Sequence, residues 1–73
     1  MSTAPDTVRE KLLEILVEAT EREQVSQQRY ALGASLATDP EAKEMFLRLI
    51  EDEMSHERIL RARLVAIRGR ESS

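Results

Sequence analysis

The stretch Thr38-Asp39-Pro40-Glu41 decides the fold, because it is the one clear break in a sequence otherwise compatible with continuous helix. Asp39 is a favourable residue for the position that caps a helix N-terminus. Pro40 suits the first helical position, and Glu41 suits the positive end of the helix dipole. A connection this short forces the helices on its two sides to fold back on one another. The sequence therefore predicts an all-α protein built from an antiparallel two-helix hairpin.

The rest of the chain extends outward from this turn as a single domain over residues 1–73. We predict a first helix over about residues 6–37, a turn at 38–40, and a second helix over about 40–68. Gly69 follows the second helix and could end it in the left-handed conformation that glycine adopts readily. No repeat, linker or second domain is evident.

Each predicted helix carries a stripe with alternating spacings of four and three residues, typical of a helix face that packs against partners. Glu23, Glu53 and His56 fall on these otherwise apolar stripes, although a buried carboxylate is costly unless a positive group meets it. Gly33 also falls there, which fits either close approach of a neighbouring helix or a glycine that is merely tolerated. The stripe positions are Leu12, Leu16, Ala19, Glu23, Ser26, Tyr30, Gly33 and Ala37, then Ala42, Phe46, Leu49, Glu53, His56, Leu60, Arg63 or Leu64, and Ile67.

Distance from the turn places these three residues at one level of the hairpin. Glu23 lies 15 residues before the start of the turn stretch, and Glu53 lies 14 residues after its Asp39. At about 1.5 Å per residue, both lie roughly 21–23 Å from the turn. His56 follows Glu53 by one helical turn, and the pair has the Glu-x-x-His form used in di-iron helix bundles. We therefore expect the three residues to bind metal. The alternative is that the stripe is misplaced by one residue and all three face solvent.

One hairpin supplies only two carboxylates and one imidazole, and two helices cannot enclose a dry core. Two hairpins related by a two-fold axis would form a four-helix bundle with four glutamates and two histidines at its centre. Two Fe²⁺ ions would then balance four carboxylates. The sequence predicts a homodimer with a di-iron site between its chains. Manganese accepts the same ligands and stays open as an alternative.

The chain resembles the ferritin-like superfamily, specifically its rubrerythrin and encapsulated-ferritin branch. The resemblance covers about residues 12–62. It rests on Glu23 followed seven residues later by Tyr30, on the turn stretch 38–41, and on the Glu-x-x-His segment 53–56. Encapsulated ferritins carry this hairpin once and rebuild the four-helix site across a dimer, so the resemblance implies the same ferritin-like four-helix bundle here.

The resemblance implies that Glu23, Glu53 and His56 are iron ligands and that Tyr30 is a hydrogen-bond partner of a ligand carboxylate. Judged as a residue alone, Tyr30 is a core aromatic, and the two roles are compatible. A ring of several dimers inside an encapsulin shell would also resemble the encapsulated ferritins. The C-terminal residues 67–73 contain no clear shell-targeting tail.

Composition limits the possible functions. The 73-residue chain has no cysteine, which excludes disulfides, iron–sulfur clusters and a rubredoxin-type electron-transfer module. The net charge of −3 argues against nucleic-acid binding, and no apolar run reaches the ~20 residues of a membrane span. We expect a cytoplasmic protein or one enclosed in an encapsulin nanocompartment. Several acidic residues near the expected site either guide Fe²⁺ towards it or form a solvated face: Glu14, Glu18, Glu21, Asp52 and Glu57.

These observations favour a ferroxidase, with Glu23, Glu53 and His56 as catalytic residues. It would oxidise Fe²⁺ to Fe³⁺ with O₂ or peroxide, in iron storage or detoxification. One alternative is a rubrerythrin-like peroxide reductase, which needs an external electron donor. Another is a metal-free dimeric helical scaffold, which would explain the buried charges in some other way.

Overall fold

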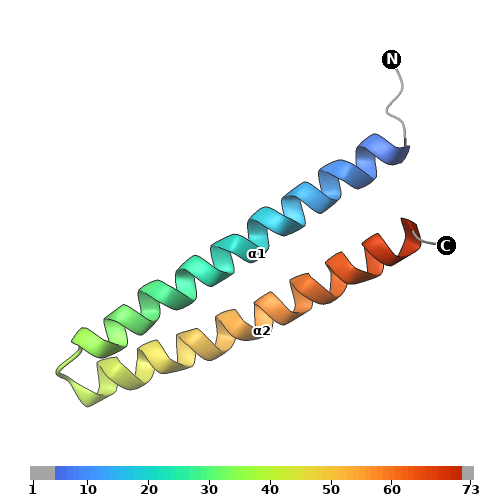
Figure 1. Ribbon diagram of the computed structural model, residues 1–73. Helices are drawn as coiled ribbons and strands as arrows, with labels where there is room; N and C mark the ends of the chain where they lie inside the picture. Colours follow the sequence, from blue (N-terminus) through green and yellow to red (C-terminus); the bar gives the residue numbers. More distant parts are fainter. Residues whose placement is uncertain (1–4, 72–73) are drawn as a thin grey trace.

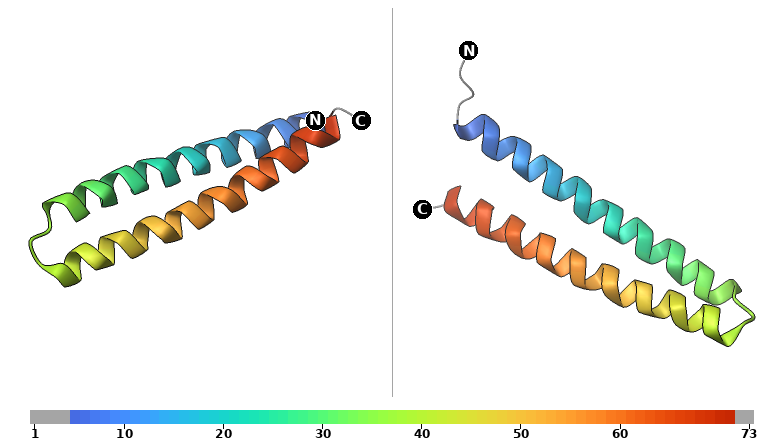
Figure 2. Two further views of the ribbon diagram at one scale, coloured as in Figure 1. Left: turned by 60° about the horizontal axis from the view of Figure 1, so that its bottom comes forward. Right: turned by 180° about the vertical axis from the view of Figure 1, so that it is seen from behind.

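The computed structural model describes residues 5–71 of the chain, with side chains for residues 7–69. It consists of two antiparallel α-helices of 32 residues each, α1 over Pro5–Leu36 and α2 over Pro40–Glu71. Figures 1 and 2 show the helices side by side, with the turn at one end and both chain ends at the other. The predicted all-α hairpin is confirmed.

The turn is held by the residues that predicted it. The Asp39 carboxylate accepts a hydrogen bond from the backbone N–H of Glu41 at 3.3 Å, and the Asp39 carbonyl accepts one from Lys43 at 3.0 Å. At the end of α1, the Ala37 N–H donates to the Gly33 carbonyl at 2.9 Å. Asp39 is thus the N-cap of α2, and it satisfies a backbone donor that the helix itself cannot.

The predicted end of the second helix was wrong. α2 continues through Gly69 to Glu71, and no described glycine has a positive φ. A glycine within a helix costs about 1 kcal/mol relative to alanine, so it weakens a helix without ending it. The boundaries of α1 and the start of α2 agree with the prediction to within one residue.

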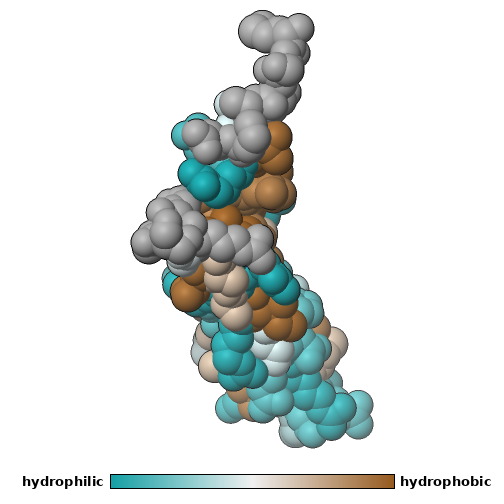
Figure 3. All heavy atoms as spheres, turned by 90° about the vertical axis from the view of Figure 1, so that its right-hand side faces the viewer, coloured by the Kyte–Doolittle hydropathy of each residue, from teal (hydrophilic) through white to brown (hydrophobic). Residues whose placement is uncertain are grey.

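The hairpin is a single layer without an enclosed core. Its smallest extent is 12 Å, about the diameter of one helix with its side chains. Among residues 7–69, only Thr20, Ala34 and Leu64 are buried. Brown, hydrophobic residues accordingly reach the surface in Figure 3. The large apolar side chains that remain exposed are Val8, Leu12, Ile15, Val25, Leu32, Leu36, Met45, Leu47, Met54, Ile59 and Val65.

Near the turn, an aromatic ring from α2 lies against a glycine of α1. A Cβ atom added at Gly33 would lie 2.8 Å from Cε1 and Cζ of Phe46, and 3.0 Å from Cδ1. The Phe46 ring also lies beside that of Tyr30, with centroids 6.3 Å apart and planes inclined at 32°. Of the two interpretations of Gly33, the structure supports close approach of the neighbouring helix.

No helix within residues 5–71 has the length and hydropathy that would be needed to cross a membrane.

Candidate metal centre

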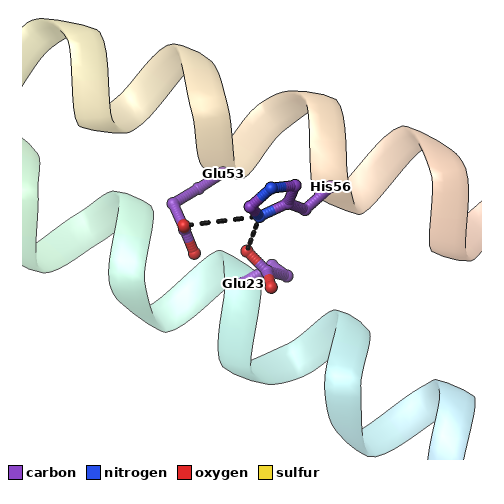
Figure 4. Close-up of side chains that lie close together, drawn as sticks. All are labelled: Glu23, Glu53 and His56. Carbon is purple, nitrogen blue, oxygen red and sulfur yellow. Dashed lines mark ion pairs between the residues drawn. The ribbon is translucent and has the colours of Figure 1, made fainter.

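Glu23, Glu53 and His56 come together near the middle of the hairpin. α1 supplies Glu23, while α2 supplies Glu53 and His56 from one face, one turn apart. One ligand atom from each residue can be chosen so that all three lie within 4.8 Å of one another. Figure 4 shows one nitrogen of the His56 ring facing both carboxylates. The spacing argument from the turn therefore placed the three side chains at the correct level.

The distances within this cluster suit a shared cation. Nδ1 of His56 lies 3.5 Å from Oε2 of Glu23 and 3.5 Å from Oε1 of Glu53. Each of these separations exceeds the ordinary length of a hydrogen bond. Neither carboxylate therefore forms a close hydrogen bond with the imidazole nitrogen. A neutral imidazole nitrogen and two carboxylate oxygens that converge on one point are ligands that iron and manganese accept.

The two carboxylates repel one another without metal. The neighbouring Glu23 raises the pKa of Glu53, first through a hydrogen bond between the two carboxyl groups, which requires a proton. Loss of hydration raises this pKa further, and the negative charge of Glu23 adds to the effect. A raised pKa means that Glu53 disfavours its negative charge in the metal-free protein, and a cation in the same place would stabilise that charge.

One oxygen of Glu23 gives a separate indication that a cation fits here. Oε2 of Glu23 is buried and accepts no hydrogen bond from the described residues. A buried acceptor without a donor is costly, and such groups call for a specific explanation. A metal ion bound to this oxygen would remove that cost, so the donor set fits the metal that the sequence predicts.

The site is open on the side of His56. The His56 side chain is 55% exposed, whereas those of Glu23 and Glu53 are 21% and 18% exposed. Three donors from one chain also fall short of the coordination that iron adopts. The described residues of a single hairpin thus supply three candidate metal ligands, with room for further ligands on the open side.

Tyr30 lies away from the three ligands along α1, towards the turn. Its ring contacts Phe46, and within the described part of the chain its hydroxyl has no hydrogen bond. The structure thus shows Tyr30 packed beside Phe46 and partly exposed. A hydrogen bond from Tyr30 to a ligand carboxylate stays a prediction, which a second copy of the chain would have to fulfil.

Sequence reasoning missed a polar network beside the cluster. Glu57 accepts hydrogen bonds from Nε2 of Gln27 at 2.7 Å, from Nε2 of Gln24 at 3.2 Å, and from Nε of Arg61 at 2.6 Å. The bond from Gln27, followed by that from Arg61, lowers the pKa of Glu57. Its side chain is only 18% exposed, which argues against the solvated face, one of the two alternatives for this residue. The pair Gln24 and Gln27, spaced for one helix face, was the available signal.

The fold and the cluster together define a helical hairpin with the carboxylate and histidine groups of a ferritin-like metal site. A family model for rubrerythrin matches residues 3–68, and the chain belongs to the rubrerythrin family. Iron is the metal that this family typically binds. A comparison with curated proteins gave no match. A comparison with solved structures gave none either.

Proposed function

We propose that this protein oxidises Fe²⁺ to Fe³⁺ at a di-iron site shared by two copies of the chain. The observation that carries the proposal is the cluster of Glu23, Glu53 and His56, whose ligand atoms lie within 4.8 Å of one another. Carboxylate and imidazole ligands with open positions suit iron that reacts with oxygen or peroxide. Membership of the rubrerythrin family supports iron as the metal.

Two copies are proposed because one hairpin leaves both the metal ligands and the apolar surface incomplete. A second hairpin would add two carboxylates and one imidazole on the open side of the site and would cover exposed apolar side chains. Glu23 lies 18 residues after Pro5 and 13 before Leu36, close to the middle of α1. Two hairpins that meet at this level therefore overlap over most of their length.

The residues would have distinct tasks in the reaction. Glu23 and Glu53 would bind Fe²⁺ through their carboxylates, whose negative charge favours the more highly charged Fe³⁺. His56 supplies a neutral nitrogen ligand. Each Fe²⁺ gives up one electron, so two neighbouring ions supply two electrons. Together with two protons, these reduce O₂ to hydrogen peroxide, or hydrogen peroxide to water.

Anaerobic titration of the metal-free protein with Fe²⁺, followed by O₂, tests the proposal through the near-ultraviolet absorbance of Fe³⁺. We expect saturation at one iron per chain, in an oligomer with an even number of chains, and then rapid oxidation. Glu53→Gln should abolish both the stoichiometric binding of Fe²⁺ and its rapid oxidation. Glu51→Gln, at an exposed position on the same helix, is the matched control and should leave them intact. A folded protein that binds no Fe²⁺ would refute the proposal and leave the metal-free scaffold.

Peroxide reduction is the second candidate function, and the match to the rubrerythrin family favours it. The chain has no cysteine for an electron-transfer module, so the electrons would come from a separate donor. Rapid oxidation of bound Fe²⁺ by peroxide with slow oxidation by O₂ would identify this function. A ring of dimers and an encapsulin shell stay predictions, which the mass of the native assembly would test.

A further inference from the structure

The hydrogen bonds of Glu57 differ in kind from the others in the hairpin. Gln24 and Gln27 lie on α1 and donate to Glu57 on α2. Outside the cluster of Glu23, Glu53 and His56, the other side-chain hydrogen bonds between residues 11 and 69 join groups within one helix or cap its first turn. Between residues 11 and 69, Glu57 is therefore where directed hydrogen bonds join the two helices outside the candidate metal ligands.

The residues of this hydrogen-bonded network lie directly beside the candidate metal ligands in the sequence. Gln24 follows Glu23, and Glu57 follows His56. Neighbouring residues on a helix point in different directions. Gln24 and Glu57 therefore form a hydrogen-bonded pair separate from the candidate ligands, which form the adjoining cluster. The backbone positions of Gln24 and Glu57 determine those of Glu23 and His56. Any shift that separates the first pair also displaces the second.

Apolar contacts alone fix the register of two helices poorly. Burial of apolar surface is non-directional, so a sliding or rotating helix can exchange one aliphatic neighbour for another. Hydrogen bonds have narrow limits of distance and angle. Buried polar residues specify register in coiled coils by this means, even where they reduce stability. A metal site needs its groups within about 0.5 Å of the productive geometry, far less than one helical turn.

We propose that Glu57, held by Gln24 and Gln27, is a positioning residue that sets the helix register in which Glu23 lies opposite Glu53 and His56. The inference rests on the proposed function, because its consequence is metal binding by these three ligands. Glu57 does not itself bind the metal. Its carboxylate already accepts three hydrogen bonds, from Gln24, Gln27 and Arg61.

A triple replacement of Gln24, Gln27 and Glu57 by leucine separates positioning from stability. Replacing a partly buried polar network by apolar groups is often neutral or stabilising, so the melting temperature should stay level or rise. Binding of Co²⁺, whose visible spectrum reports the ligand geometry, should weaken by about 10- to 100-fold and show an altered spectrum. A purely structural network would lose stability and leave the spectrum of the bound ion unchanged.

A charge swap provides a second test that does not depend on the leucine variant folding. Gln27→Glu places two carboxylates face to face and should weaken Co²⁺ binding. Adding Glu57→Gln restores one carboxylate and one amide, so the double variant should regain much of the affinity. Glu44→Gln is the matched control, because Glu44 also accepts a hydrogen bond from an arginine four residues on, Arg48 at 2.8 Å, but Glu44 is exposed and this bond lies within α2.

The outcomes distinguish the inference from the function on which it rests. Failure of the wild-type protein to bind Co²⁺ and Fe²⁺ would overturn both. If the wild-type protein binds these ions and the leucine triple variant binds them with the same affinity and spectrum, only the positioning role is overturned. Should that variant fail to fold, a Gln27→Glu variant with unchanged affinity and spectrum would have the same consequence.

Discussion

Replacement of Gly33 by alanine tests the close approach of the two helices near the turn. Alanine favours the helix by about 1 kcal/mol over glycine. The new Cβ would lie 2.8 Å from two atoms of the Phe46 ring, whereas carbon atoms in contact prefer about 3.5–4.0 Å. The ring must therefore move by roughly 1 Å, and overfilling of this kind costs about 1–3 kcal/mol. We expect a net destabilisation of about 1 kcal/mol, or about 4–8 °C in melting temperature.

Gly69→Ala is the control for this experiment. Gly69 also lies within a helix, but no neighbouring group among the described residues lies within 4 Å of the position that its Cβ would take. This substitution should show only the propensity gain, up to about 1 kcal/mol of added stability. Both variants should be followed by far-ultraviolet circular dichroism at one fixed protein concentration, because the melting temperature of an oligomer depends on concentration.

Replacing Phe46 by a shorter residue should reverse the sign of the stability change caused by Gly33→Ala. In a Phe46→Leu background the ring that obstructs the new methyl group is gone, so Gly33→Ala should stabilise by about 1 kcal/mol. The two substitutions are then coupled by about 2 kcal/mol, within the range found for residues in contact. If Gly33→Ala stabilises the wild-type protein as much as Gly69→Ala does, the close approach inferred for this part of the hairpin is refuted.

Three further predictions concern the turn, the site and the apolar surface. Asp39→Ala should lower the unfolding free energy by about 1 kcal/mol in denaturant titrations, because the Glu41 N–H loses its acceptor, whereas Asp39→Asn should lose little. The raised pKa of Glu53 gives a stability contribution that is present below the ordinary glutamate pKa and is lost as the pH rises through the raised value. Glutamine lacks this pH-dependent contribution. In the presence of chelator, the melting temperature of Glu53→Gln should therefore rise relative to that of the wild type as the pH increases between the two pKa values. A difference in melting temperature that stays constant with pH would contradict this. Leu12→Glu, at an exposed stripe position, should reduce the solution mass in light scattering, and an unchanged mass would exclude this position from the interface.

The sequence was most informative where the governing physics is local or periodic. Asp39 and Pro40 act on the backbone next to them, so the turn was predictable without knowledge of the rest of the fold. Glu23 and Glu53 were placed at one level by counting residues from that turn, because helical rise is constant. The structure agrees with both predictions.

Features that depend on several contacts at once were not predictable. Gly69 is a local signal for the end of a helix, but the helix ends there only if the following residues are more stable outside a helix than within one. In the structure, α2 continues to Glu71. Whether Glu57 faces solvent or the other helix depends on the rotation of α2 about its axis. That rotation is set by all the contacts between the helices, which a stripe pattern defines only to within about one residue.

The three-residue connection between Leu36 and Pro40 also determines the order in which the hairpin forms and opens. Gly33 and Phe46 meet across a short loop of chain, whereas the Gln24–Glu57 contact spans 33 residues, and the entropy lost on closing a loop rises slowly with its length. Folding that starts at the turn thus proceeds stepwise along the two helices, and opening starts at the helix ends that lie far from the turn. The acidic and imidazole groups at mid-length separate only after the outer half of each helix has come apart. Bound ions would thus be retained through fluctuations that already expose the chain ends to solvent exchange.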